Sequence, residues 1–484
     1  MSESLKNKTV KGVFWSSIER FSVQGVQFII QIIIARILLP SDYGLIGMLT
    51  IFLAVSQSLI DSGFSNALIR KQNCSDTDYS TVFYFNIIVG ILLYGVLYIL
   101  APFIASFYRT SELINITRVV AITLFINSLT VVQRAKLTRN VDFKTQTKAS
   151  LTAAIVSGII AIIMAYSHYG VWALVIQSVL NGLITMILLW ILSKWIPRNV
   201  FSRQSFKEMF SFGSKLLVSG LIDTLYRNLF TLIIGKQFNK ADLGYYTRAD
   251  QFAQLPSSNL TGIFGRVTYP ILSTLQNDDK RLEEVYRKYL RLSAFGIFPL
   301  MTGLAALASP LIILLLTEKW AGVVILLQII CFSYMWYPIH AINLNLLQVK
   351  GRSDLFLRLE IMKKGIGIAM LFITVPIGIN AMCIGSIATS IIALIINTHY
   401  TGKLINVDFL KQMKDLFPIL LYALSMYLVI SFSIKWIESD VIKLIVGFSI
   451  GVFYYFLIAY FTNSPELKAF YSLIYEYNNK LNNK

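Results

Sequence analysis

The stretch ARILLPSDYGLIGMLTIFLAVSQSLIDSGFSNALIRK, residues 35–71, sets the architecture of this chain, because a weaker copy, GKQFNKADLGYYTRADQFAQLPSSNLTGIFGRVTYPI, occupies residues 235–271 without a gap. Five positions are identical at a spacing of 200 residues, namely 42 and 242, 44 and 244, 52 and 252, 58 and 258, and 64 and 264. Both copies also place a basic residue, Arg36 or Lys236, and then D-x-G between two long apolar segments. In a membrane chain, an internal repeat of this kind indicates a transporter whose site lies between its two halves.

Composition places the chain in a membrane. Its 484 residues are 56% hydrophobic and only 14% charged, with a mean hydropathy of +0.64, which a soluble domain cannot sustain. The net charge of +18 could suggest nucleic acid as a partner, but the Lys and Arg residues occupy short segments between apolar runs. That distribution is typical of a multi-pass membrane protein, so we expect no nucleic acid partner.

The sequence contains no motif for catalysis or cofactor binding. Cys74, Cys331 and Cys383 are far apart, and there is no P-loop and no cluster of His, Cys or carboxylate residues at metal-ligand spacing. We therefore expect no enzyme activity, no cofactor and no metal. The first apolar segment is too long for a signal-peptide core, so we expect it to be retained as a helix.

About fourteen segments are long and apolar enough to be predicted as membrane-spanning helices. Basic residues are concentrated in alternate loops between them, which predicts that both termini lie in the cytoplasm. An even number of predicted helices separates the two copies of the repeat, so the halves are expected to be parallel repeats. The predicted spans are residues 12–39, 43–63, 80–107, 112–132, 147–167, 170–193, 208–235, 243–272, 290–316, 321–348, 355–376, 379–398, 416–434 and 441–461.

The expected architecture is therefore an all-α polytopic membrane protein built from two lobes of six helices each. The first lobe would comprise residues 1–200 and the second lobe residues 201–405. Residues 406–484 would add two further transmembrane helices and a cytoplasmic tail.

The first predicted helix carries a polar stripe at membrane depth. Arg20, Gln24, Gln27 and Gln31 are four, three and four residues apart, which places them on one helical face. A charged residue inside a span costs about 2.5–3.5 kcal/mol on insertion scales, so this face should not contact lipid. We predict that it lines a lumen able to hold an anionic, hydrogen-bonding solute. A packing contact between helices is the alternative interpretation.

Carboxylates inside predicted spans are candidates for binding a coupling ion, because a desolvated carboxylate can be tuned to titrate near neutral pH. Asp61 and Glu360 are of this kind, although Glu360 lies near Lys363, and an ordinary ion pair is an equal alternative. Asp223 lies four residues before Arg227. These two side chains could form an ion pair, which would partly neutralise Arg227. A structural role for Arg227 is then an equal alternative to substrate binding.

A second polar cluster precedes a proline in the second copy of the repeat. Arg248, Asp250 and Gln254 lie close together in the sequence, and Pro256 favours a kink that suits a helix bending during transport. We expect Arg248 and Gln254 to bind substrate and Asp250 to be a further candidate for a coupling ion. His340 lies in a segment rich in aromatic and amide side chains and is expected to be a hydrogen-bonded filler rather than a ligand.

Two segments of the repeat resemble a known family. LLPSDYGLIGMLTIFLAVSQSLIDSGFSNALIRK, residues 38–71, resembles the second-helix signature of Wzx-type oligosaccharide flippases. LGYYTRADQFAQLP, residues 243–256, is similar to the signature at the matching place in their second half. These flippases share a superfamily with the multidrug and toxin extruders and the lipid II flippases. The resemblance extends over the whole chain in helix number, orientation and repeat.

The resemblance implies a MATE-like pair of lobes that alternates between inward and outward openings. The substrate would be an oligosaccharide repeat unit on a polyprenyl pyrophosphate, moved across the bacterial cytoplasmic membrane for surface polysaccharides such as the O-antigen of lipopolysaccharide. Membrane lipids and other polysaccharide-assembly proteins would be its partners. The side chains that would bind this substrate are those of Arg20, Gln24, Gln27, Gln31, Arg227, Arg248 and Gln254.

Two other classes of protein remain as alternatives. A drug or cation antiporter of the same fold should have a cavity rich in acidic and aromatic side chains, whereas arginines outnumber unpaired acids among the lumen candidates here. Arginines suit a pyrophosphate or an acidic sugar. A scaffold protein that only organises polysaccharide assembly has no need for a polar stripe at membrane depth.

Overall fold

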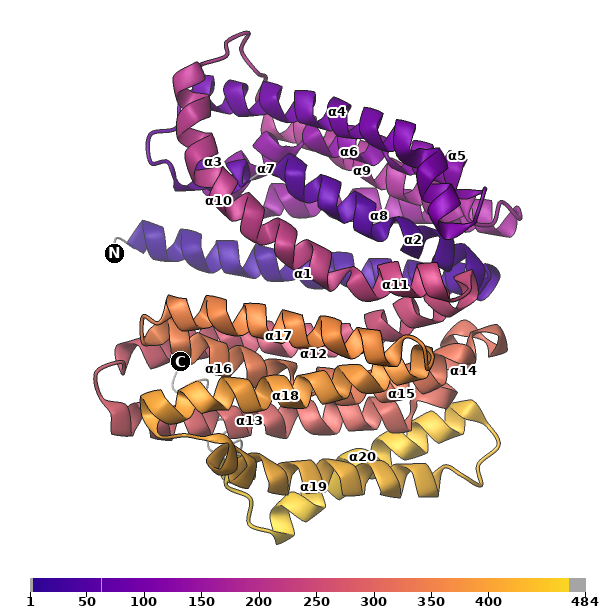
Figure 1. Ribbon diagram of the computed structural model, residues 1–484, viewed down its shortest axis with the longest axis vertical. Helices are drawn as coiled ribbons and strands as arrows, with labels where there is room; N and C mark the ends of the chain where they lie inside the picture. The colour runs from indigo at the N-terminus through magenta and orange to yellow at the C-terminus, as the bar shows by residue number, and fades with distance from the viewer. Residues whose placement is uncertain (1–2, 62, 470–484) are drawn as a thin grey trace. The chain divides into compact units, whose positions relative to one another are not determined.

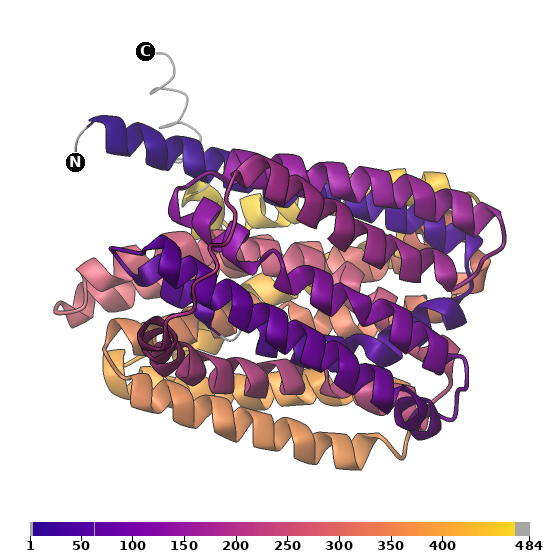
Figure 2. The ribbon, with the colours of Figure 1, turned by 90° about the horizontal axis from the view of Figure 1, so that it is seen from above.

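The computed structural model describes residues 3–61 and 63–469 and is helical throughout, with no strand among those residues. Most side chains before residue 21, and that of Lys215, lie outside this description. Contacts between residues divide the chain into two compact units, Met1–Gly244 and Tyr245–Lys484. In both views of the ribbon the long helices of each unit run side by side (Figures 1 and 2).

The first unit contains eleven helices and the first turn of a twelfth. In chain order these are α1 (Glu3–Ile37), α2 (Pro40–Asp61), α3 (Phe64–Arg70), α4 (Asp76–Tyr108), α5 (Leu113–Val120), α6 (Ile122–Ser128), α7 (Val131–Arg139), α8 (Phe143–Tyr166), α9 (Trp172–Ser193), α10 (Arg203–Arg227), α11 (Leu229–Gln237) and the start of α12 (Lys240–Thr274).

The second unit contains the rest of α12 and the helices that follow it. These are α13 (Asp279–Ala306), α14 (Ala308–Leu316), the short 3-10 helix η1 (Glu318–Trp320), α15 (Gly322–Tyr334), α16 (Tyr337–Val349), α17 (Ser353–Thr374), α18 (Ile379–Ile405), α19 (Phe409–Ser433) and α20 (Asp440–Phe461).

Every predicted span overlaps a helix, and four spans are interrupted. Residues 208–235, 290–316 and 321–348 each contain one short interruption between consecutive helices, and residues 112–132 contain two. By length and composition, ten helices within the described residues can cross a membrane, or eleven if the bent pair Leu113–Ser128 and Val131–Arg139 is one span. Helices α1, α12 and α17 are not among them. The polytopic all-α class is confirmed, and the count of fourteen spans stays a prediction.

Small residues let the helices of the first unit approach closely. Helix α8 packs against both α1 and α9, and Ala149, Ala153 and Ala161 on α8 are fully buried. A Cβ atom added at Gly158 would lie only 2.2 Å from the Cδ1 atom of Ile30 on α1. Close approach at small residues is a main source of stability between helices in a membrane, where the hydrophobic effect between them is absent.

Helices α10 and α11 belong to the first unit because they pack along α2. A Cβ atom at Gly63, just after α2, would lie 2.6 Å from the backbone oxygen of Gly213, and the hydroxyls of Ser58 and Thr224 are 3.0 Å apart. Contacts therefore place the division after residue 244. The lobes 1–200 and 201–405 follow the repeat instead, and they remain a proposal about the moving parts.

Lys71 ties three segments together at one end of the first unit. Its Nζ atom lies 3.0 Å from Asp78 on α4 and 3.0 Å from Glu208 on α10. Desolvation lowers the pKa of Lys71, but the hydrogen bonds to the two carboxylates outweigh it and raise that pKa above its ordinary value. The pair with Asp78 is nearly buried on the carboxylate side, whereas Glu208 is 58% exposed, so Lys71 is held firmly to α4 and reaches α10 through a more exposed contact.

The last two long helices are an integral part of the second unit. Helix α19 packs along α13 and α20, and α19 and α20 lie side by side in Figure 1. Inside this contact, the hydroxyl of Tyr286 donates to Asn343 at 2.8 Å and accepts from Gln412 at 3.0 Å, and Gln412 also donates to Thr401 at 3.2 Å. These polar groups are buried, and the network satisfies them.

Candidate functional site

The polar stripe of α1 divides into a packed end and an open part. The Nε2 atom of Gln31 donates to Oε1 of Gln177 on α9 at 3.1 Å, so this residue makes the helix-packing contact that was the alternative interpretation. Gln27 is exposed, and Gln24 is partly exposed. The side chain of Arg20 lies outside the described residues. The open part of the stripe thus consists of Gln24 and Gln27.

Asp61 is connected to a chain of amide side chains in the first unit. Gln57, one turn earlier on α2, donates from Nε2 to the Asp61 carboxylate at 3.3 Å. Its Oε1 atom accepts from Asn127 at 3.0 Å. Gln57 and Asn127 were not predicted as site residues. The position of Gln57 four residues before Asp61 could have indicated it, whereas the face of Asn127 depends on how the helices pack.

The ion pair between Asp223 and Arg227 is confirmed. Arg227 Nε lies 2.8 Å from Asp223 Oδ2, and the two side chains are 68% and 43% exposed. Helix α10 ends here, where the side-chain amide of Asn228 donates to the backbone oxygen of Thr224 at 2.8 Å. Arg227 lies within the apolar helical segment Leu216–Gln237. A guanidinium in a membrane span is costly to expose to lipid, so we expect this ion pair to face water or another polar surface.

The candidates on α12 are partly buried in the second unit. Arg248 is 8% exposed, and its Nη1 atom donates to Oε1 of Gln251 at 2.6 Å. Asp250 accepts a hydrogen bond of 2.8 Å from the hydroxyl of Tyr334. Gln254 is exposed. Pro256 lies inside α12, which continues past it.

Two further candidates have structural partners. Glu360 accepts from Lys363 at 2.5 Å, one turn along α17, which is the ordinary ion pair that its neighbours suggested. His340 contacts Ser390 at 2.9 Å and Asn397 at 3.2 Å, both on α18. The interpretation of His340 as a hydrogen-bonded filler is confirmed, because both ring nitrogens have partners within the unit.

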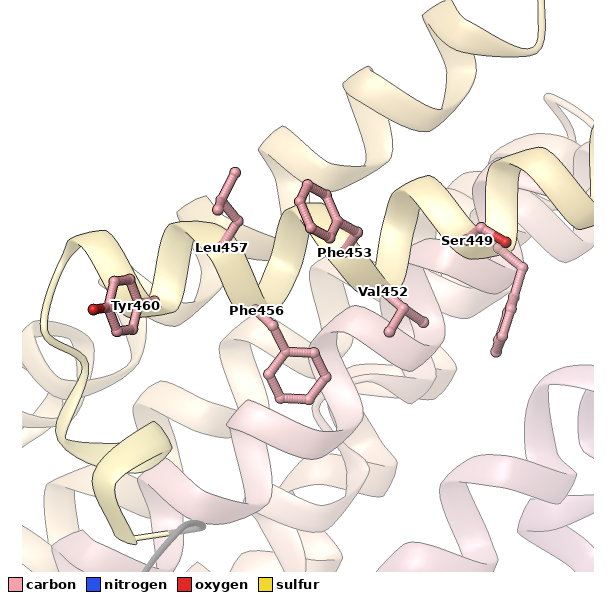
Figure 3. Close-up of a pocket in the computed structure, with 7 residues that line it drawn as sticks. Ser449, Val452, Phe453, Phe456, Leu457 and Tyr460 are labelled. Carbon is pink, nitrogen blue, oxygen red and sulfur yellow. The ribbon is translucent and has the colours of Figure 1, made fainter.

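A shallow hollow on α20 is a different kind of surface. It has a volume of about 560 Å³, and Figure 3 shows side chains of this one helix around it, including Val452, Phe453 and Phe456. Its lining has no charged residue. Phe453 is 70% exposed, as suits a surface covered by lipid chains, so the hollow is not a candidate for binding a charged head group.

The cysteines and carboxylates form no metal centre in the part of the chain that the structure covers. Cys74, Cys331 and Cys383 are free. No group of three His, Cys, Asp or Glu residues within residues 3–61 and 63–469 could hold a metal ion. The polar chemistry of the described site is therefore that of arginine, amides and carboxylates.

Comparison with known proteins assigns the family. The family model described as polysaccharide biosynthesis protein matches residues 33–325. The chain belongs to this family. The region of the chain that matches the family model begins within α1 and ends within α15, and it includes both copies of the repeat.

Individual relatives agree with this assignment. The chain is 28% identical to the teichuronic acid biosynthesis protein TuaB of Bacillus subtilis over 354 residues, which is 73% of each chain. It is 24% identical to the lipopolysaccharide biosynthesis protein WzxC of Escherichia coli over 403 residues, 82% of this chain and 80% of that protein. These matches confirm the resemblance to Wzx-type proteins.

A solved structure confirms the fold. The lipid II flippase MurJ in an inward closed conformation is similar with a TM-score of 0.75, covering 93% of this chain and 99% of MurJ at 16% identity. At that identity the likeness concerns the fold. This member of the polysaccharide biosynthesis family is thus a multi-pass membrane protein with the helical architecture of a flippase.

Proposed function

We propose that this protein flips polyprenyl-pyrophosphate-linked oligosaccharide repeat units across the cytoplasmic membrane by alternating access, for assembly of a surface polysaccharide. Membership of the polysaccharide biosynthesis family supports the substrate class, and the MurJ-like fold supports the mode of transport. The protein would act without enzyme activity or cofactor. Both termini would lie in the cytoplasm, and other polysaccharide-assembly proteins would receive the flipped unit.

The observation that carries this proposal is the exposed Arg227 within an apolar helical segment. Its side chain is 68% exposed in the segment Leu216–Gln237 even though it pairs with Asp223, so its remaining donors are open to a polar space beside it. A guanidinium presents a fork of donors that matches phosphate or carboxylate oxygens. The exposed amides of Gln27 and Gln254 suit sugar hydroxyls. Arg20, Gln24, Gln31 and Arg248 complete the proposed substrate-binding set.

The proposed function predicts a specific lipid intermediate. When expression is switched off, an intact polyprenyl-pyrophosphate oligosaccharide should accumulate, because synthesis on the inner leaflet continues while transfer to the outer leaflet stops. Mass spectrometry of lipid extracts measures this accumulation, and the mass gives the composition of the repeat unit. Re-expression of the intact chain from a plasmid is the control, and it should return the intermediate to its starting level.

Two other results would replace the proposal. If lipid-linked sugars are unchanged and the cells become sensitive to cationic drugs, the protein is an antiporter of the same fold. If both the lipid intermediate and drug sensitivity are unchanged while polysaccharide chains change in length, the scaffold interpretation holds.

Asp250 is the carboxylate that we propose to bind a coupling proton or cation. It lies on α12 of the second unit, where it accepts from the hydroxyl of Tyr334. Asp61, hydrogen-bonded to Gln57, is the second candidate, whereas Asp223 and Glu360 are each committed to an ion pair. A coupling carboxylate should have neutral partners that allow it to release and rebind its cation.

Asp250→Asn is expected to abolish the response of flipping to an imposed pH or sodium gradient. Asparagine keeps the hydrogen bond to Tyr334 but cannot change its charge. The measurement is flipping of a fluorescent lipid-linked oligosaccharide in proteoliposomes with and without each gradient. Asp354→Asn, on an exposed carboxylate paired with Arg352, is the control. A gradient response that persists in Asp250→Asn rules out this assignment and directs the same test to Asp61.

A further inference from the structure

The two D-x-G motifs of the repeat meet in space. A Cβ atom added at Gly44 on α2 would lie 1.7 Å from the backbone oxygen of Lys240, and one added at Gly244 on α12 would lie 1.9 Å from the backbone oxygen of Pro40. All four residues belong to the first unit. We call these four residues the glycine crossing. They bring the first turns of α2 and α12 into backbone contact.

The glycine crossing has the symmetry of the repeat. In the repeat, Pro40 corresponds to Lys240 and Gly44 corresponds to Gly244. The contact of Gly44 with Lys240 therefore has a counterpart in the contact of Gly244 with Pro40. Each helix start thus offers a glycine to the carbonyl of the other. Real Cβ atoms essentially never approach backbone atoms to less than 3.0 Å, so no residue other than glycine fits either position. This explains one of the five identities between the copies.

The contacts around the glycine crossing are close but individually weak. Lys240 Nζ lies 3.2 Å from Glu112, with the two side chains 41% and 56% exposed. Lys236 donates to the backbone oxygen of Phe107 at 2.5 Å. An exposed ion pair contributes little to stability. Both contacts are of a kind that can break and reform without large cost.

The crossing lies at the end of the helices where basic loop residues are sparse. The connections that lead into α2 at Pro40 and into α12 at Lys240 carry few basic residues, whereas the other ends of the same helices adjoin segments rich in Lys and Arg. By the positive-inside rule, the sparse side is the outer side of the membrane. A transporter with alternating access must close this side whenever its path is open to the cytoplasm.

We propose that the glycine crossing is part of the outer gate of the transport path, and that Gly44 and Gly244 are the residues that allow the first turns of α2 and α12 to come together when the gate closes. This inference rests on the proposed function for the identity of what passes. The geometry of the gate itself does not depend on the substrate. Release to the outside would require the first turns of α2 and α12 to separate. Since α2 packs on α4, that movement would also draw Lys236 away from Phe107 on α4 and Lys240 away from Glu112.

The test is whether a methyl group at the crossing holds the outer end open. Gly44→Ala and Gly244→Ala each place a Cβ atom where a carbonyl oxygen now lies. The reporter is Met48→Cys in a chain whose three native cysteines are changed to alanine. Met48 is 2% exposed, and its Cγ atom would lie 3.1 Å from a Cβ at Gly235 on α11. We expect a membrane-impermeant maleimide, added outside intact cells, to label the reporter thiol severalfold faster in both variants.

Two glycine variants serve as controls. Gly95→Ala on α4 adds a methyl group with no atom within 4 Å, and Gly158→Ala adds one against Ile30, far from the crossing in sequence. Neither should change the labelling of the reporter thiol. Equal labelling of the parent, Gly44→Ala and Gly244→Ala, with all three folded by size-exclusion chromatography, overturns the proposal. So does an equal rise in Gly158→Ala, because the rise would then reflect general loosening.

A cross-link tests the same joint without changing a glycine. Cysteines replacing Glu112 and Lys240, whose side chains form an ion pair, can be bridged by a short, cleavable thiol reagent. We expect flipping in proteoliposomes to stop on bridging and to resume on cleavage, and unchanged flipping in the bridged protein overturns the gate. If labelling responds as expected but no lipid-linked oligosaccharide accumulates on depletion, the gate stands and the proposed substrate is wrong.

Discussion

Asp415→Ala is expected to lower the free energy of unfolding by about 1.5–3 kcal/mol, because it removes charge-assisted hydrogen bonds to two arginines whose side chains are 31% and 32% exposed. Asp415 on α19 accepts from Arg287 Nε at 2.7 Å and from Arg287 Nη2 at 2.9 Å. Arg291 lies 3.5 Å from the same carboxylate and 3.1 Å from Glu466. The Asp415 and Glu466 side chains are each only 6% exposed, so solvent screens these interactions weakly.

This network fixes the last helices to the core of the second unit. Arg287 and Arg291 lie on α13, Asp415 on α19, and Glu466 follows α20. One carboxylate therefore links the core helix to the two helices that the sequence marked as an addition. Its loss should loosen α19, because the remaining partners of the two arginines, Glu283 at 3.7 Å from Arg287 and Glu466 at 3.1 Å from Arg291, do not lie on that helix.

Thermal unfolding in detergent, followed by fluorescence of a fused reporter on size-exclusion chromatography, measures the effect. Asp415→Asn keeps the shape and one acceptor, so we expect an intermediate loss. Asp354→Ala is the matched control. Asp354 pairs with Arg352 at 2.7 Å, but these side chains are 63% and 46% exposed, so no measurable loss is expected. An unfolding temperature equal to that of the parent in Asp415→Ala would contradict the role of this network.

Arg227→Ala is expected to reduce the rate of flipping by roughly 10- to 100-fold, which corresponds to the loss of about 1.5–3 kcal/mol for hydrogen bonds to a charged group. The guanidinium is the exposed cation that carries the proposed function. Arg227→Lys should retain part of the rate, because an ammonium keeps the charge but loses the planar fork of donors. Flipping in proteoliposomes, normalised to the amount of folded protein, is the measurement.

The chain offers a close control for this substitution. Arg198 pairs with Asp76 at 2.7 Å, with side chains 68% and 41% exposed. The pair of Arg227 and Asp223 has a distance of 2.8 Å and exposures of 68% and 43%. Arg198 lies between α9 and α10, outside the apolar segments. Arg198→Ala should therefore leave flipping unchanged, and an equal fall in both variants would remove Arg227 from the substrate path.

Local patterns in the sequence predicted much of the site. Apolar length, the repeat and the alternation of basic loops are each read directly from the order of residues, so they predicted the helices and the membrane class. The four-residue spacing of Asp223 and Arg227 predicted their ion pair, because residues so spaced are neighbours on any helix. The similar spacing within α1 indicated a polar face that includes Gln31, and Asp61 was a candidate because it is a carboxylate inside a predicted span.

The hydrogen-bond partners of the polar side chains on these helices depend on tertiary structure. Gln31 meets Gln177, and the amide next to Asp61 meets Asn127, because packing fixes the rotation and depth of each helix, which no local pattern encodes. Packing likewise leaves Arg227 exposed and buries Arg248, although both are arginines in polar stretches.

The D-x-G repeat shows the division most clearly. The order of residues alone established that glycine recurs at positions 44 and 244, along with the helical, membrane-spanning character of the chain. The reason for glycine at these positions came from the folded chain, because the backbone oxygens of Lys240 and Pro40 occupy the space of the missing Cβ atoms. A contact between residues some 200 positions apart arises from folding of the whole first unit, and it cannot be predicted from the spacing of residues along one helix.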